Sequence, residues 1–293
     1  MKRTLVNIPI TFFLLSGIII GCQPKKSTLQ QQSALEQSAT NVKTTKSDHV
    51  ATGEGIRDTV YQNDIVTTIK GHFIENDTTF FLKTYFKEDG KKYLNTQIYI
   101  EPDRESIRYK EIIARRQSDS GYQEKDLNGW NMLRQKYNLP SLQKVALPDI
   151  PTDWISLHLY KDHYYVYSPC QIDVPNPRWL TDTVLIYDDL EPYFIEIRKI
   201  EKQSPSLYHI ELGRRGYDTI CTTPTQLYIH IIDTLNKTSI WEHKDEGHTH
   251  YELMIPAESA KNFDMIVCNC LNLDDELDFE EPNFLKLLEQ SYE

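Results

Sequence analysis

The sequence lacks the short motifs that mark well-known catalytic sites. It contains no G-x-S-x-G elbow, no H-E-x-x-H, no P-loop and no dinucleotide-binding glycine fingerprint. Paired carboxylates for glycoside hydrolysis meet in space rather than in sequence, so the absence of a motif does not exclude that chemistry. We expect a non-catalytic protein and keep a hydrolase as the alternative.

The chain also lacks an excess of cations. Its formal net charge is −11. Residues 1–58 carry seven Lys and Arg against four Asp and Glu, a net charge of +3, which leaves −14 for the remainder. An acidic body does not neutralise phosphates, so a nucleic-acid ligand and an electrostatic membrane contact of the body are disfavoured. A protein or glycan partner fits the charge better.

No apolar run reaches the length of about 20 residues that a spanning helix needs. The longest runs from about Leu5 to Ile20, is interrupted by Asn7 and Pro9, and follows a short basic start at Lys2 and Arg3. This order of a positive segment and a short apolar segment is typical of a secretory signal peptide. We assign residues 1–21 to it.

The signal peptide ends in Ile19-Ile20-Gly21-Cys22, which resembles the lipobox of bacterial lipoproteins. The resemblance covers only residues 1–22. It implies cleavage before Cys22, a diacylglycerol thioether on the Cys22 sulfur and acylation, such as by palmitate, of the new amino terminus. Two or more acyl chains hold a protein at a membrane for long times. By the habit of that family, Gln23 favours the outer membrane of the cell envelope, and the periplasmic or surface side stays open.

Residues 22–58 form the lipidated start and a polar segment of Gln, Ser, Thr and Lys with hardly an aromatic residue. Such a composition cannot bury enough apolar surface to offset its ordering entropy, so we expect a flexible linker. We divide the rest into a hairpin and helical subdomain, 59–149, and a second β domain, 150–293.

Residues 59–149 begin with runs of alternating polarity, and Asp89-Gly90 separates two of them. This dipeptide predicts a β-hairpin. Two helical segments follow in our reading, "ESIRYKEIIARR" and "NGWNMLRQKYNLP", the second stopped by Pro140. A proline-rich connection then predicts a boundary near Asp149.

Residues 150–293 carry short runs rich in Tyr and Ile, punctuated by Asp, Asn, Pro and Gly. This spacing is typical of antiparallel β-sandwiches and barrels. The segment "PNFLKLLEQSYE" predicts a closing C-terminal helix. The expected fold is mainly β, with α+β features at the margins: antiparallel sandwich or barrel-like sheets, a few short helices and a C-terminal helix.

Three histidines, His243, His248 and His250, lie in "WEHKDEGHTHYE". We read this stretch as a hairpin with a loop at 244–247, which places His243 opposite His248 and all three imidazoles on one face. Three imidazoles can ligate zinc or copper and leave a fourth position open. The alternative is a solvated polar face without metal or other cofactor, with the apolar face toward the core.

Four cysteines follow Cys22, namely Cys170, Cys221, Cys268 and Cys270. An exported chain can oxidise them, and four cysteines allow three complete pairings. Cys268 and Cys270 share one face of a predicted strand, so a core position or a distant partner is favoured over a bond between them. No CxxC motif is present, so we expect structural thiols or a disulfide rather than redox activity.

Tyrosine is frequent, with 18 in 293 residues. In "HYYVYSP", Tyr165 and Tyr167 share one strand face, and Trp241 lies beside the histidines. Exposed aromatic rings suit sugars or protein partners, whereas buried ones only pack. We expect a lipid-anchored, non-catalytic module that binds a protein or glycan, with Tyr165, Tyr167 and Trp241 as candidate contacts. The alternatives are a tethered metal-dependent hydrolase that uses the histidines and a structural envelope component without ligand.

Overall fold

The computed structural model describes residues 59–62, 66–170, 177–188, 193–216, 220–221, 225–245, 247–270 and 277–291. The predicted signal peptide, Cys22 and the linker therefore lie outside the described residues. The described residues belong to one compact unit, Ala39–Glu293. No helix within the described ranges has the length and apolar character needed to cross a membrane.

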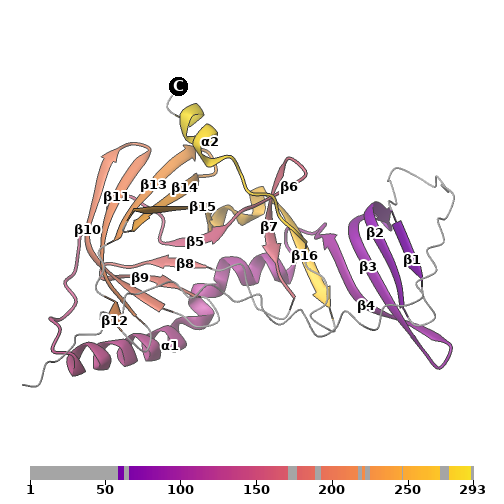
Figure 1. Ribbon diagram of the computed structural model, residues 1–293, viewed down its shortest axis with the longest axis horizontal. Coiled ribbons are helices and arrows are strands. Elements are labelled where there is room, and N and C mark those ends of the chain that lie inside the picture. The colour runs from indigo at the N-terminus through magenta and orange to yellow at the C-terminus, as the bar shows by residue number, and fades with distance from the viewer. Residues whose placement is uncertain are drawn as a thin grey trace, which may run out of the picture. The chain divides into compact units, whose positions relative to one another are not determined.

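Eight antiparallel strands of the described chain close into a barrel (Figure 1). Seven of the eight strand pairings join barrel strands that follow one another along the chain, including β10 with β11, and the pairing of β15 with β5 closes the ring. A short strand, β12 (Ile220–Cys221), adds to β11. The barrel strands are β5 (Asp153–Ser156), β8 (Arg178–Leu180), β9 (Val184–Tyr187), β10 (Tyr193–Ser204), β11 (Leu207–Gly216), β13 (Thr225–Asp233), β14 (Thr238–Asp245) and β15 (His248–Pro256).

The other described strands form a seven-stranded sheet in the order β1-β2-β3-β4-β16-β7-β6. Strand β16 runs antiparallel to β4 and parallel to β7. The sheet therefore combines strands from both sides of the boundary predicted near Asp149. Its strands are β1 (Thr59–Gln62), β2 (Val66–Glu75), β3 (Thr78–Glu88), β4 (Lys91–Ile100), β6 (His158–Tyr160), β7 (His163–Ser168) and β16 (Asp264–Cys270).

The mainly β fold and the barrel-like antiparallel sheet predicted from the sequence are confirmed. The Asp89-Gly90 hairpin is also confirmed, since Glu88 pairs with Lys91 across it. Both turn residues have positive φ, 50° and 76°, which a two-residue type I′ turn requires.

The two helical segments predicted between β4 and β5 are one helix, α1 (Ile107–Lys136), of 30 residues. The expectation of two short helices was wrong at this point. The helix ends before Asn138, which adopts a left-handed φ of 52°, two residues ahead of Pro140. A 3₁₀ turn, η1 (Ala257–Asn262), precedes β16, and the predicted C-terminal helix is α2 (Phe284–Ser291).

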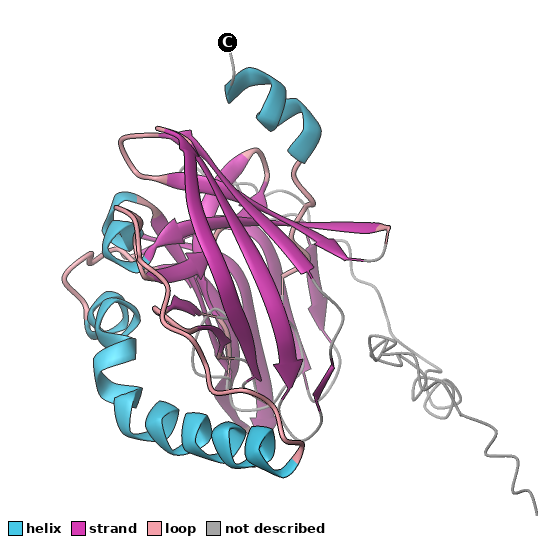
Figure 2. Cartoon of the chain, turned by 90° about the vertical axis from the view of Figure 1, so that its left-hand side faces the viewer, coloured by secondary structure: helices cyan, strands magenta, loops and turns pink. Residues whose placement is uncertain are grey.

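Apolar residues cover both faces of the barrel strands. Trp241 points into the barrel, where its ring meets Trp154 edge to face at 5.5 Å. Its neighbour Ile240 points outward and packs with Met265 and Val267 of β16. Helix α1 packs on the outside of β8, β9 and β10, with Trp130 stacked on Phe194. In Figure 2 it lies at the left and lower edge of the strands.

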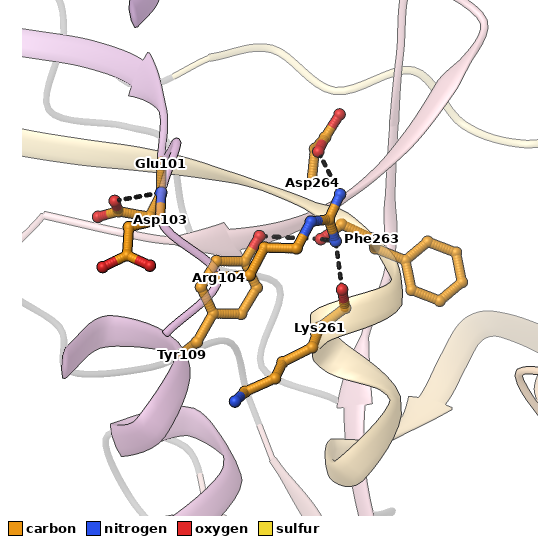
Figure 3. A network of polar contacts seen from close by, with 7 residues as sticks. All are labelled: Glu101, Asp103, Arg104, Tyr109, Lys261, Phe263 and Asp264. Carbon is orange, nitrogen blue, oxygen red and sulfur yellow. Dashed lines mark hydrogen bonds and ion pairs between the residues drawn. The ribbon is translucent and has the colours of Figure 1, made fainter. Parts of the chain in front are cut away.

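Arg104 fixes the start of α1 to the segment between η1 and β16 (Figure 3). Its guanidinium donates hydrogen bonds to the carbonyl oxygens of Lys261 and Phe263, the latter at 2.7 Å, and to Asp264 Oδ1 at 2.6 Å. The Tyr109 hydroxyl donates to the Phe263 carbonyl at 2.9 Å, and burial raises the pKa of Tyr109 to about 12. These contacts position the first turns of α1 beside β16.

Candidate functional site

A groove of about 610 Å³ lies between the first turns of α1 and the ends of β7 and β16. Its volume falls in the range of about 300–1,000 Å³ that is usual for ligand sites. We call it the α1 groove. Its walls are Ile107, Arg108, Lys110, Glu111, Ile112, Ala114 and Arg115 from α1, Ser168, Pro169 and Cys170 from the end of β7, and Cys268, Asn269 and Cys270 from β16.

Three cysteines form the sulfur cluster in this groove. A disulfide joins Cys170 to Cys270, with the Cα atoms 5.7 Å apart. The third sulfur, that of Cys268, lies within 4.8 Å of both others. Two sulfurs come together because Cys268 and Cys270 are two residues apart on one strand and therefore share a face. The side chain of Cys221, the remaining disulfide candidate, lies outside the described residues.

Helix α1 gives the groove a cationic wall. Arg108, Lys110 and Arg115 line it, against one carboxylate, Glu111. Arg108 Nη1 donates to Ser168 Oγ at 3.4 Å, which ties α1 to the end of β7. Arg115 Nη2 pairs with Asp188 Oδ2 at 3.2 Å. Lys110 is exposed, so the groove presents positive charge to solvent in a chain that is acidic overall.

The three predicted metal-binding histidines occupy a different place, at one end of the barrel. Strand pairing sets His243 opposite His250, so the predicted pairing with His248 was wrong. All three still share one strand face, because the loop keeps an even length. At Trp241 and His243 this face is the inside of the barrel, since Trp241 packs in the barrel core, whereas His248 and His250 nearer the hairpin end are exposed.

The imidazoles of this trio are not brought together as metal ligands. The rings of His243 and His250 have centroids 6.3 Å apart, and His248 and His250 are exposed. Within the described ranges, only the three cysteines bring three His, Cys, Asp or Glu ligand atoms within 4.8 Å of one another. The histidines therefore form no three-ligand zinc site in this conformation.

His243 instead joins Arg178, Tyr187 and Glu252 in what we call the barrel cluster. Its Nε2 lies 3.3 Å from the Tyr187 hydroxyl and 3.3 Å from Glu252 Oε2. Arg178 Nη2 donates to Glu252 Oε1 at 3.1 Å, and its guanidinium covers the Tyr187 ring at 4.2 Å. Burial works to raise the pKa of Glu252, but the adjacent His243 and Arg178 outweigh it and lower the pKa to about 2. The carboxylate is therefore held charged by protein groups.

The aromatic contacts proposed from the sequence are buried. Trp241 has 0% exposure in the barrel core, and Tyr165 and Tyr167 have 8% and 6% in the core of the seven-stranded sheet. In this conformation they offer almost no surface to a partner. Tyr167 packs against Phe279 with ring centroids 4.8 Å apart.

Sequence reasoning missed the α1 groove, although a helical signal for it exists. Arg108, Glu111, Ile112 and Arg115 follow the spacing i, i+3, i+4, i+7 and therefore share one helix face. What the spacing does not reveal is that β7 and β16 meet this face.

Comparisons with protein-family models, with curated proteins and with solved structures give no match to this chain.

Proposed function

We propose that this protein is a non-catalytic lipoprotein of the bacterial cell envelope, held at the outer membrane by lipid on Cys22, that binds an acidic segment of a protein partner in the α1 groove. The observation that carries the proposal is the groove itself, with its volume of about 610 Å³ and its cationic helix wall.

The anchor is supported by the lipobox sequence that ends at Cys22. The Cys170–Cys270 disulfide supports export, because such bonds persist in oxidising compartments and are rare in reducing ones. A polar linker of residues 22–58 would let the folded part range on the order of 30 Å from the membrane.

Charge and shape favour an acidic protein segment as the ligand. Arg108 and Lys110 stand on a body of net negative charge, so a ligand carboxylate is attracted to this wall and repelled elsewhere. Ile107, which is 66% exposed, supplies an apolar contact in the same groove. A glycan is less favoured, because Tyr165, Tyr167 and Trp241 are buried and cannot stack on sugar rings.

The metal-dependent hydrolase is the competing function. It has less support, because His243 lies against Glu252 and Tyr187, while His248 and His250 are exposed and do not converge with it. Metal analysis of the purified protein and a panel of ester, phosphate and glycoside substrates should give no signal. Turnover that is lost in His248→Ala would favour the hydrolase.

Cross-linking in living cells tests the groove. A photoreactive amino acid replaces Ile107, which lines the groove, or Met132, which is 70% exposed on the same helix outside it. We expect one protein species to cross-link from position 107 through an acidic segment, with at least tenfold less product from position 132. Arg108→Glu should abolish the product. Equal products from both positions, a glycan product, or none would contradict the proposal.

The anchor has its own test. In cell fractionation, Cys22→Ser should move the protein out of the detergent-extracted lipid fraction, because a body of net negative charge is not attracted to anionic lipid once the acyl chains are lost. If the processed variant still partitions wholly with the lipid, the anchor assignment fails.

A further inference from the structure

The sulfur cluster contains one bridge and a third sulfur within reach of it. The Sγ atoms of Cys170, Cys268 and Cys270 all lie within 4.8 Å of one another. The two sulfur atoms of a disulfide are about 2 Å apart, and rotation of the cysteine side chains can close most of the remaining distance between two sulfurs of this cluster. Two different pairings of Cys170 are therefore accessible from nearly one backbone arrangement.

The pairing of β7 with β16 brings the segment that carries Cys170 close to both partners. Strand β16 runs parallel to β7, with Ile266 beside Tyr167 and Val267 beside Ser168. Strand β7 ends at Ser168, and two residues later Cys170 packs in the same apolar cluster as Ile266 and Cys268. Its sulfur lies within 4.8 Å of those of Cys268 and Cys270. Since these two share one strand face, each presents its sulfur to Cys170 from one side.

The two possible partners differ in exposure. Cys170 and Cys268 are buried, with exposures of 4% and 3%, whereas Cys270 is partly exposed. All three line the α1 groove. A thiolate that forms on Cys270 therefore meets the groove, where the cations of α1 favour it electrostatically.

We propose that the sulfur cluster is a thiol–disulfide exchange centre that reacts with disulfides entering the α1 groove. The Cys268 thiolate attacks Cys170 Sγ, a Cys268–Cys170 bond forms, the Cys170–Cys270 bond breaks, and Cys270 leaves as a thiolate. The proton lost from Cys268 is available to Cys270, so the step needs no oxidant or reductant. The Cys270 thiolate then attacks an external disulfide, forms a mixed disulfide and releases one thiolate.

This inference goes beyond partner binding and fails separately from it. Binding depends on the cationic wall and is measured by cross-linking. Exchange depends on the sulfurs and is measured by mass spectrometry.

Glutathione disulfide is the probe. The full chain, purified in detergent without reductant, is incubated with it under native conditions, and intact mass and disulfide-mapped peptides are measured. We expect one glutathionyl group on Cys270 together with a Cys170–Cys268 bridge. A group on Cys268 with the Cys170–Cys270 bridge retained would overturn the proposal, and so would a native cluster that acquires no group while the unfolded chain does.

Two single variants separate the roles of the neighbouring cysteines. Cys268→Ala keeps the Cys170–Cys270 bridge and should acquire no glutathionyl group in the cluster. Cys270→Ala should form the Cys170–Cys268 bridge and likewise acquire none. Two unbridged thiols at 170 and 268 in folded, air-oxidised Cys270→Ala would show that the second pairing is inaccessible. The wild-type mapping decides the question if either variant fails to fold.

Discussion

The barrel cluster and the α1 groove both gather charged side chains, yet they use them in opposite ways. In the barrel cluster, Arg178, Tyr187, His243 and Glu252 contact one another inside a closed wall of strands. In the groove, Arg108 and Lys110 border an open volume and are only partly engaged by protein groups. Charged side chains that pair with one another inside the barrel stabilise the fold. Charged side chains that border an open groove are available to a ligand.

The largest effect should come from Arg178 in the barrel. Arg178→Met leaves the charged Glu252 side chain buried without its cation, so the free energy of unfolding should fall by about 3–5 kcal/mol. Urea unfolding at pH 7 measures it. The double variant Arg178→Met/Glu252→Leu should recover most of the loss, because it removes both charges. A loss below about 1 kcal/mol in the single variant would mean that the cluster is as solvated as a surface ion pair.

The next effect concerns the sulfur cluster. Removing the bridge with Cys170→Ala should cost about 3 kcal/mol, because the bond closes a long loop of the unfolded chain. Cys270→Ala should cost clearly less, because Cys268 takes over as the partner of Cys170. The free energies of unfolding of the two variants are measured with and without reductant. Equal losses in the two variants would argue that Cys268 cannot form the bond.

A smaller effect on stability is the pH dependence, which differs between the seven-stranded sheet and the barrel cluster. Burial lowers the pKa of His158, in β6 of the seven-stranded sheet, to about 4. The unfolded chain takes up a proton near pH 6.5 while the folded one stays neutral, so stability falls as the pH drops from about 6.5 toward 4. The loss between pH 7 and 5 should be about 2 kcal/mol.

The matched variant is His158→Phe, which keeps an aromatic ring against Phe279, whose centroid lies 4.6 Å away. It should remove most of this pH dependence, with a remainder from His230, whose pKa burial also lowers. Glu252 behaves differently. Its lowered pKa makes its contribution persist down to pH 4.5 and disappear only toward pH 2. An unchanged slope in His158→Phe would remove His158 as the cause.

The strands and turns of this fold could be predicted because they depend on local sequence. Alternating runs and the Asp89-Gly90 pair specify a hairpin within a few residues. Closure of the barrel depends on the pairing of β15 with β5, about a hundred residues apart, which no local pattern encodes. The choice of Cys270 over Cys268 and Cys221 as the partner of Cys170 is also a property of the assembled strands.

The histidine site illustrates a second limit. Alternation in β14 and β15 correctly placed His243, His248 and His250 on one face. It could not tell which face is solvated, because Ile240 and Trp241, neighbours on opposite faces, are both fully buried. In a barrel packed against other elements, polarity along a strand does not identify the outside.

The smallest effect on stability is expected at Arg108 in the groove, and it is the most informative one for function. Arg108→Ala should change the free energy of unfolding by no more than about 0.5 kcal/mol, because the side chain is partly exposed and makes one long hydrogen bond to Ser168. Its effect on cross-linking from position 107 should be large, at least fivefold. Lys125→Ala is the charge-matched control, since Lys125 is exposed on the same helix outside the groove. If Arg108→Ala destabilises the chain as strongly as Arg178→Met, or if Lys125→Ala reduces cross-linking equally, the groove cation has no separate binding role.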